Sequence, residues 1–390
     1  MKKYYLFCNG SRGDCEPAIC LAQYMINKGD QVHIYANEKN KNLLKKSGIN
    51  HDIIFKNYIN KQPENVSPLE YFHEFKNTII DHINIINNIH DKPNAIFGMG
   101  DQLGKFLSEK FKIPYYHIVL QYYHVPSNAS NKSYKELGEE MLERLYRKFV
   151  SYYELKYFNK IRVSNNLDEI NDFMDYIHNN NNTIVANSLI LSNFDYIKHE
   201  KVFISGNINL LTPLDFSINE IYGLSNFMNS NTNYIYLNLG SMSQNLDNKL
   251  FNLYEKAFEN INCKVIIGCN RKDKSKNDQF FFCSSINQHE LFPKMKIIIH
   301  CGGLGVAFKA AYYGVPQIII PKNFEEPFWA EKVKQLGCGE SISDFKYLTE
   351  FNLKEKVQII LKNPLIYHNA KILAKSIDIN GAENIYSNYL

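Results

Sequence analysis

Short apolar runs alternate along the chain with longer stretches in which apolar residues recur every three to four positions. In the first half, the runs lie at residues 3–8, 31–36, 94–98, 115–120, 183–186 and 201–205. In the second half, they lie at residues 234–237, 264–267, 281–283, 296–299 and 316–320. Such runs predict buried strands, and the stretches between them predict helices. The alternation is typical of parallel sheets with helices on both faces, so we expect an α/β fold.

The first predicted strand leads directly into a glycine-containing loop that opens a helix. The loop reads Gly10-Ser11-Arg12-Gly13-Asp14-Cys15-Glu16-Pro17. Apolar residues at positions 18, 19, 21, 22, 25 and 26 predict the helix, with Pro17 in its first turn and Gly29 at its end. Asp14 is therefore expected at the entrance of a helix.

A second loop of this kind follows the run at residues 296–299. It reads His300-Cys301-Gly302-Gly303-Leu304-Gly305, and a helix is predicted over residues 307–313. Glycines let backbone N–H groups approach an anion closely, and the helix dipole favours negative charge there. The pattern therefore predicts a phosphate or diphosphate site. A tight strand-to-helix turn that binds no ligand is the alternative.

The two strand-loop-helix patterns predict two Rossmann-like, doubly wound domains facing a cleft. At 390 residues, the chain is long enough for two cores. Residues 207–231 contain Pro213, Gly223 and several Asn and Ser residues, which is typical of a linker. The predicted divisions are a first domain over 1–206, a linker over 207–232, a second domain over 233–370 and a tail over 371–390.

Composition and charge exclude several classes of protein. Hydrophobic residues make up 45% of the chain and charged residues 22%, which is ordinary for a globular protein. The net charge of +4 gives no reason to expect nucleic acid as a partner. No run approaches the roughly 20 apolar residues of a membrane span. Because the chain opens on a predicted strand, we expect no signal peptide. The eight cysteines show no CxxC pair and no metal-ligand spacing, so we expect reduced thiols, no metal and a cytoplasmic location.

Several motifs resemble those of the GT-B glycosyltransferases of family 1, which include bacterial and fungal sterol, macrolide and glycopeptide-antibiotic glucosyltransferases. The loop at residues 10–17 resembles their GSRGD-x-x-P start. Leu239-Gly240-Ser241-Met242 resembles the FGSM turn that opens their second domain. Residues 286–329 resemble their donor-binding half, with its HHGGAGT, GVPQ and GDQPFWA motifs. The resemblance follows the family's order at both ends of the chain and is weak between about residues 40 and 230.

The resemblance implies an inverting, metal-independent glycosyltransferase without a cofactor. Such an enzyme moves a hexose from a UDP- or dTDP-sugar to a hydroxyl group of a lipophilic small molecule, of the natural-product, sterol or macrolide class. A peripheral membrane contact would follow only if the acceptor is a lipid. The resemblance also implies that residues 371–390 cross back to the first domain. The stretch 133–177 predicts helices whose apolar stripe packs into a core, and in this family that region borders the acceptor pocket.

The resemblance assigns the acceptor side to the first domain. Asp14 would be the base that takes the acceptor proton, and Arg12 would orient it. Ser11 and His124 would line the acceptor side. The plainer alternatives are that Asp14 only caps its helix, that Arg12 is a surface charge, and that His124 is a packed or surface histidine.

The resemblance assigns the donor to the second domain. Ser241 and the backbone N–H groups at residues 302–305 would hold the diphosphate while an oxocarbenium-like centre develops. Glu325 and Glu326 would accept hydrogen bonds from sugar hydroxyls, unless they form only an exposed acidic turn. The predicted phosphate-binding residues are Gly240, Ser241, His300, Cys301, Gly302, Gly303 and Gly305.

Several positions depart from the family pattern at this predicted donor site. The family's phosphate-contacting histidine falls on Cys301 and not on His300, and its phosphate-binding Thr or Ser falls on Val306. Its Asp-Gln pair falls on Glu325-Glu326, and the Pro-His of its nucleotide-side turn falls on Asn287-Gln288. Cys and Val cannot donate the hydrogen bonds of His and Thr, and one lost charge-assisted bond costs roughly 1.5–3 kcal/mol.

Three explanations of these departures stay open: His300 takes over, the donor is unusual, or sugar transfer has been lost. The second hypothesis is therefore a GT-B protein without normal transfer, which serves as a partner, a binding protein or an enzyme repurposed for other chemistry. A dinucleotide oxidoreductase is a third hypothesis. It is disfavoured because residues 10–13 lack the full G-x-G-x-x-G spacing and no acidic residue is clearly placed for a ribose. The acceptor, the sugar and the oligomeric state do not follow from the sequence.

Overall fold

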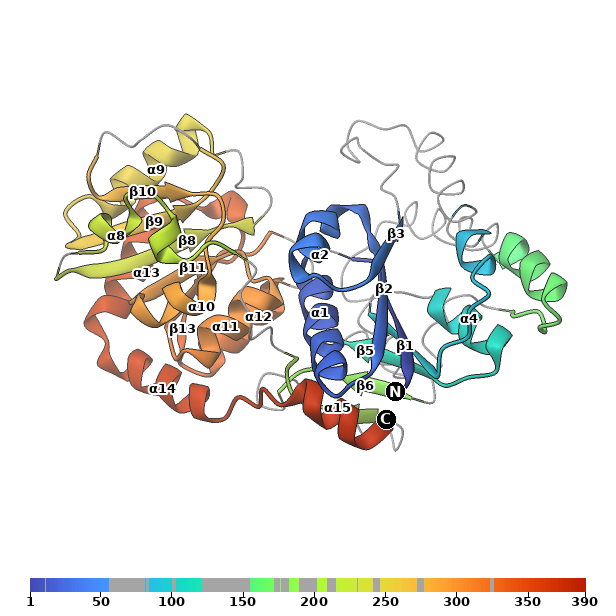
Figure 1. The fold of residues 1–390 in the computed structure, drawn as a ribbon. Helices are drawn as coiled ribbons and strands as arrows, with labels where there is room; N and C mark the ends of the chain where they lie inside the picture. Colours follow the sequence, from blue (N-terminus) through green and yellow to red (C-terminus); the bar gives the residue numbers. More distant parts are fainter. Residues whose placement is uncertain are drawn as a thin grey trace. The chain divides into compact units, whose positions relative to one another are not determined.

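The computed structural model describes residues 1–10, 12–55, 81, 84–99, 103–120, 155–171, 176, 182–188, 202–208, 215–229, 231–240, 246–271, 277–322 and 326–390. The chain forms two compact units, one of Met1–Leu211 with Asp378–Leu390 and one of Thr212–Ile377. Each unit is built on a parallel sheet flanked by helices, as Figure 1 shows. The α/β class predicted from the alternating pattern is confirmed.

The first unit contains a seven-stranded sheet in the order β3-β2-β1-β4-β5-β6-β7. The strands are β1 (Lys3–Cys8), β2 (Gln31–Asn37), β3 (His51–Phe55), β4 (Ala95–Met99), β5 (Tyr115–Val119), β6 (Thr183–Val185) and β7 (Val202–Ile204). Leu6 of β1 aligns with Ile34 of β2 on one side and Phe97 of β4 on the other. Strands that are paired on both edges and covered on both faces are buried throughout, which explains their continuous apolar runs.

Helices cover this sheet. They include α1 (Arg12–Asn27), the short 3₁₀ helix η1 (Glu38–Asn40), α2 (Lys41–Ser47) and α4 (Leu103–Phe111). The buried residues of α1 are spaced at three and four positions and face β1 and β2; they include Ile19, Ala22 and Met25. Gly29 ends the helix with a positive φ of 91°, and its N–H donates to the carbonyl of Ile26.

The start of α1 differs from the prediction. The helix begins at Arg12, so the prediction that Pro17 lies in the first turn is wrong. Pro17 lies inside the helix and has no N–H with which to bind the carbonyl of Gly13, so one helical hydrogen bond is missing there. The first turn includes Asp14 and the buried Cys15.

The C-terminal segment belongs to the first unit. Its helix α15 (Gly381–Tyr389) packs against α1. The backbone N–H of Asp378 donates to Ser188 Oγ at 2.9 Å, and the Asn207 N–H donates to the Asp378 carbonyl at 2.9 Å. Ile385 of α15 is fully buried, so the segment forms part of the core of this unit.

The second unit contains a six-stranded sheet in the order β10-β9-β8-β11-β12-β13. The strands are β8 (Asn233–Asn238), β9 (Cys263–Gly268), β10 (Phe280–Cys283), β11 (Ile297–His300), β12 (Gln317–Ile319) and β13 (Gly339–Ser341). Side chains of β8 alternate between two hydrophobic clusters: Ile235 and Leu237 enter one, and Tyr234 and Tyr236 enter the other. The sheet therefore has a core on each face.

Several helices of the second unit begin at side-chain caps. They are α8 (Leu224–Phe227), α9 (Asn248–Phe258), α10 (Gln288–Leu291), α11 (Leu304–Tyr312), α12 (Glu326–Gln335), α13 (Glu350–Lys362) and α14 (Pro364–Lys375), with 3₁₀ helices η6 (Ile218–Glu220), η8 (Phe292–Lys294) and η9 (Phe345–Tyr347). The Asp247 side chain caps α9, and Thr349 with Asn352 forms a capping box on α13.

Two strands were not predicted, namely β3 and β13. Most of the stretch 133–177 lies outside the described residues, so its predicted helices are described only in part, with a helix over 155–164. In the part of the chain that the structure describes, no helix combines the length and the hydropathy needed to cross a membrane.

Candidate functional site

Both sheets reverse their strand order beside the loops that the sequence singled out. The order turns between β1 and β4 in the first unit and between β8 and β11 in the second. Open parallel sheets bind ligands beyond the carboxyl ends of their strands at such a point. Gly10 and the start of α1 follow β1, Leu239 and Gly240 follow β8, and the turn that leads into α11 follows β11. Each unit therefore carries candidate residues at its switch point.

Asp14 is held close above the loop that follows β1. A Cβ atom on Gly10 would lie 2.2 Å from Oδ2 of Asp14, so the carboxylate occupies this place only because residue 10 is glycine. The loop is fixed from the end of β2. Asn40 donates from Nδ2 to the Gly10 carbonyl at 2.9 Å, and the buried Asn37 donates to Asn9 Oδ1 at 3.3 Å.

Arg12 forms an ion pair with Glu16. Its Nε lies 2.6 Å from Oε1 of Glu16, one helical turn further along, and about half of the Arg12 side chain is exposed. This ion pair occupies the Nε–H group of the guanidinium. The role of Arg12 in orienting Asp14 stays a prediction.

The turn after β11 requires glycine at one position for two reasons. Gly302 has a φ of 110°, a conformation that L side chains rarely adopt. A Cβ there would also lie 2.9 Å from the Cβ of Glu326 and 3.0 Å from its carbonyl oxygen. The missing side chain lets the beginning of α12 pack directly on the turn.

The neighbouring glycines face open space. A Cβ on Gly303 or Gly305 would meet no atom within 4 Å. Gly303 is the N-cap of α11, so Leu304 and Gly305 are the first residues of that helix. The first N–H groups of a helix have no acceptor within it. The turn therefore combines backbone donors, the positive end of a helix dipole and room for a ligand.

Both ring nitrogens of His300 form hydrogen bonds within the protein. The residue is 1% exposed, its Nε2 lies 2.8 Å from Gln317 Oε1, and its Nδ1 accepts the Gly302 N–H at 3.1 Å. Burial lowers its pKa to about 4, so the ring is neutral at pH 7, with the proton on Nε2. A direct phosphate contact would require one of these hydrogen bonds to break. The arrangement makes His300 a residue that holds the glycine turn in place.

Cys301 faces the turn that follows β8. Its Sγ lies 3.2 Å from the place where a Cβ on Gly240 would be. Burial and a hydrogen bond with Glu326 raise the pKa of the Cys301 thiol to about 11, although the N–H of Gly303 and the charge of Lys322 act in the opposite direction. The side chain at this position is therefore a neutral thiol at pH 7.

Glu326 is buried at the start of α12. It is 5% exposed, and its Oε2 accepts the backbone N–H of Lys322 at 2.6 Å. The alternative of an exposed acidic turn is therefore wrong for Glu326. The carboxylate closes the loop between β12 and α12 and lies next to Cys301 and Gly302.

Comparison with known proteins shows what this arrangement is similar to. Residues 274–379 match the family described as Erythromycin biosynthesis protein CIII-like, C-terminal domain. The chain is 22% identical to the uncharacterized UDP-glucosyltransferase YdhE of Bacillus subtilis (strain 168), over 93% of this chain and 91% of the relative. The chain has the GT-B fold and is similar to glycosyltransferases of family 1.

Solved structures of glycosyltransferases share the fold over nearly the whole length. The glycosyltransferase of kitacinnamycin superposes with a TM-score of 0.78 at 15% identity, covering 99% of this chain and 98% of that one. Glycosyltransferase VinC, solved in complex with dTDP, superposes with a TM-score of 0.68 at 15% identity, with the same coverage.

In this structure, two of the positions that depart from the motif of those glycosyltransferases have structural roles. Val306 is partly buried and packs against the hydrophobic cluster that contains Tyr236, Ile298 and Ala310. The Asn287 side chain caps α10 by accepting the N–H of His289. Ser11, His124, Ser241 and Glu325 lie outside the described residues, so their predicted roles stay predictions.

Sequence reasoning missed Lys322. Its Nζ lies 3.5 Å from the Leu239 carbonyl and 4.1 Å from the centroid of the Phe345 ring. Lys322 follows the apolar run at 316–320, so its position just beyond the carboxyl end of a predicted strand was the available signal.

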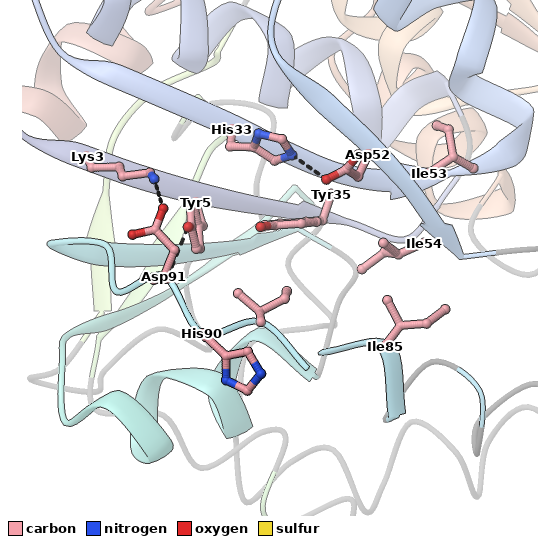
Figure 2. Close-up of a pocket in the computed structure, with 11 residues that line it drawn as sticks. Lys3, Tyr5, His33, Tyr35, Asp52, Ile53, Ile54, Ile85, His90 and Asp91 are labelled. Carbon is pink, nitrogen blue, oxygen red and sulfur yellow. Dashed lines mark hydrogen bonds and ion pairs between the residues drawn. The ribbon is translucent and has the colours of Figure 1, made fainter. Parts of the chain in front are cut away.

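A cavity of about 520 Å³ in the first unit lies away from Asp14. It is lined by residues from the amino end of β1, from β2 and β3, and from the segment before β4, as Figure 2 shows. Lys3 pairs with Asp91, and His33 Nε2 lies 2.9 Å from Asp52 Oδ2. Tyr5 donates to the Asp91 carbonyl at 3.1 Å. Since these polar groups bind one another and Asp14 follows the opposite end of β1, the cavity is not part of the candidate site.

Proposed function

We propose that the enzyme transfers a hexose, with inversion and without a metal, from a UDP- or dTDP-sugar to a hydroxyl group of a lipophilic small molecule. The observation that carries the donor is the glycine turn at residues 301–305. It combines helix N–H groups and open space at the switch point of the second sheet. A relative described as a UDP-glucosyltransferase and the dTDP complex of VinC support a nucleoside diphosphate at this turn.

The chemistry needs a base and stabilisation of a leaving group. Asp14 takes the proton of the acceptor hydroxyl while that oxygen forms a bond to the anomeric carbon. The bond from the anomeric carbon to the diphosphate breaks, and its electron pair leaves with the diphosphate. Backbone N–H groups at the start of α11 stabilise the charge that develops there. Glu326 would accept from sugar hydroxyls only through the carboxylate oxygen that the Lys322 N–H does not occupy.

A GT-B protein without sugar transfer is the second candidate. It is favoured by the neutral thiol of Cys301 and the apolar Val306 at the positions where the family binds phosphate. Such a protein would bind a nucleoside diphosphate without releasing it from a nucleotide sugar.

Calorimetry combined with a turnover assay tests both candidates. UDP, dTDP and GDP are titrated into the protein with EDTA and then with Mg²⁺. The corresponding nucleotide sugars are incubated with a panel of lipophilic acceptors, and the released diphosphate is measured. We expect metal-independent binding of UDP or dTDP, and release of that diphosphate. Binding without release across the panel would favour the second candidate. No binding at millimolar nucleotide, or binding that requires Mg²⁺, would overturn the donor proposal.

A further inference from the structure

Neither His300 nor Cys301 supplies a positive charge at the donor turn. His300 is neutral and buried, and Cys301 is a protonated thiol at pH 7. A diphosphate brings concentrated negative charge into a partly buried site, and burying an unpaired charge is costly. Backbone N–H groups alone are dipoles without net charge. A diphosphate bound at this turn would therefore be stabilised by a cation from another element.

Lys322 reaches the turn from the far side of β11. It lies beyond the carboxyl end of β12, yet its Nζ is 3.5 Å from the carbonyl of Leu239, which follows β8. In the sheet, β11 lies between β8 and β12. Neighbouring strands are about 4.8 Å apart, so the extended lysine side chain crosses the end of β11. The glycine turn begins at that same strand end.

The ammonium group of Lys322 is held by weak partners. One is the Leu239 carbonyl, and the other is the face of the Phe345 ring at 4.1 Å. The Glu326 carboxylate accepts the backbone N–H of Lys322, and its negative charge acts on the ammonium group. An ammonium has three hydrogen-bond donors and gains most from an anionic acceptor.

The half-buried position of Lys322 suits a cation whose partner is a bound anion. Burial lowers the pKa of Lys322, while the nearby Cys301 and Glu326 raise it. A phosphate group bound beside the ammonium would offset the cost of burial.

We propose that Lys322 binds the diphosphate of the donor and supplies the positive charge that the family draws from a histidine at the position of Cys301. The proposal rests on the donor site proposed above. It adds a residue on a different strand end, which reaches the same phosphate group from the β12 side.

Calorimetry on matched lysine variants tests the proposal. Lys322→Met removes the charge and keeps an unbranched side chain. Lys264→Met is the control, since Lys264 Nζ also binds a carbonyl, that of Phe227 at 3.0 Å, and lies 4.7 Å from the same ring. Lys264 belongs to β9, away from the glycine turn. Each protein is titrated with UDP and dTDP, with UMP and dTMP, and checked by its melting temperature.

The expected result is a loss of roughly 10- to 100-fold in diphosphate affinity for Lys322→Met, as the loss of a charge-assisted contact predicts. The preference for diphosphate over monophosphate should fall in parallel. Lys264→Met should bind like the wild type, and Lys322→Arg should retain most of the affinity. Normal diphosphate binding by a folded Lys322→Met variant overturns the role of Lys322 alone. Equal losses in both methionine variants overturn it as well. Absence of nucleotide binding in the wild type overturns the donor site and this inference together.

Discussion

Asp14 owes its position to one glycine. The carboxylate lies where a Cβ on residue 10 would be, at 2.2 Å from Oδ2, so any larger residue there would displace it. Asn40 fixes the same loop through the Gly10 carbonyl. Both a helix cap and a catalytic base are compatible with this placement.

The substitution Asp14→Asn separates these two roles. Asn keeps the size of the side chain and can still accept hydrogen bonds from helix N–H groups, but it cannot take a proton at neutral pH. We expect turnover to fall by roughly 10²–10⁴-fold, with diphosphate affinity and melting temperature nearly unchanged. Steady-state release of diphosphate in the presence of an acceptor measures the effect. Full turnover in this variant would leave Asp14 with capping alone, whose loss costs about 1 kcal/mol of stability.

The charge of Lys322 also predicts a pH dependence of donor binding. Burial holds its pKa below the ordinary 10.5, and only the protonated form attracts a phosphate. Diphosphate affinity should therefore be full at neutral pH and should decline as the pH rises through the pKa of Lys322. Arginine stays charged over this range, so Lys322→Arg should decline less. Calorimetry from pH 7 to pH 10 compares the wild type with Lys322→Arg. Ionisation of the uracil or thymine ring of the nucleotide affects both titrations equally. Identical slopes would count against Lys322.

At the scale of elements, the turn between β11 and α11 contains two adjacent glycines with opposite requirements. Gly302 has a positive φ and close neighbours in Glu326 and Ile319, so its glycine is needed for folding. Gly303 has a φ of −58° and nothing within 4 Å of an added Cβ. An alanine is compatible with the fold at residue 303 only.

Alanine substitutions at these glycines should therefore separate stability from binding. Gly302→Ala should cost about 2–4 kcal/mol of unfolding free energy, from backbone strain and overpacking. Gly303→Ala should cost less than about 1 kcal/mol. Its methyl group would project into the space proposed for the diphosphate, so nucleotide affinity should fall while the fold persists. Denaturant unfolding and calorimetry measure the two effects. A Gly303→Ala protein that binds UDP and dTDP normally would show that the diphosphate does not lie over this turn.

Elements buried on both faces could be predicted from the sequence. Strands such as β1 and β8 are continuous apolar runs because both faces of each sheet are covered. The strand β13 lies at the edge of its sheet and pairs with β12, and its sequence Gly339-Glu340-Ser341 contains no apolar run. In β3, the first residues His51 and Asp52 are polar and interrupt the run. These two strands form by pairing with a neighbour, which a local pattern does not show.

Part of the candidate site could also be predicted, because some of its residues carry a local signal in the sequence. Its glycines interrupt apolar runs and mark the ends of strands, which is a local signal. The hydrogen bond that occupies Nε2 of His300 is formed with Gln317, which lies on the neighbouring strand β12. The reach of Lys322 to Leu239 depends on the order of three strands. Contacts of this kind arise from tertiary structure. The sequence could therefore predict only that these residues lie near the ends of strands.

At the scale of the whole molecule, the chain leaves the first unit and returns to it at Asp378. The returning segment is held by a buried polar network. Ser188 Oγ lies 2.7 Å from Asn207 Oδ1, and both residues bind the backbone of Asp378. Tyr386 donates to Asp30 at 2.9 Å at the end of α1. The first unit is therefore completed by residues that are the last in the sequence, and its stability depends on them.

Two isoleucines of the first unit test this dependence. Ile385 in α15 is 0% exposed, and Ile26 in α1 is 41% exposed. Ile385→Ala removes buried methyl groups and should cost about 2–5 kcal/mol of unfolding free energy, whereas Ile26→Ala should change it by about 0.5 kcal/mol or less. Urea unfolding followed by circular dichroism measures both variants. Diphosphate affinity, which we assign to the second unit, should be unchanged in native buffer. If Ile385→Ala were as mild as Ile26→Ala, α15 would lie on the first unit without contributing to its stability. A loss of diphosphate affinity in a folded Ile385→Ala protein would instead show that the donor site depends on the first unit.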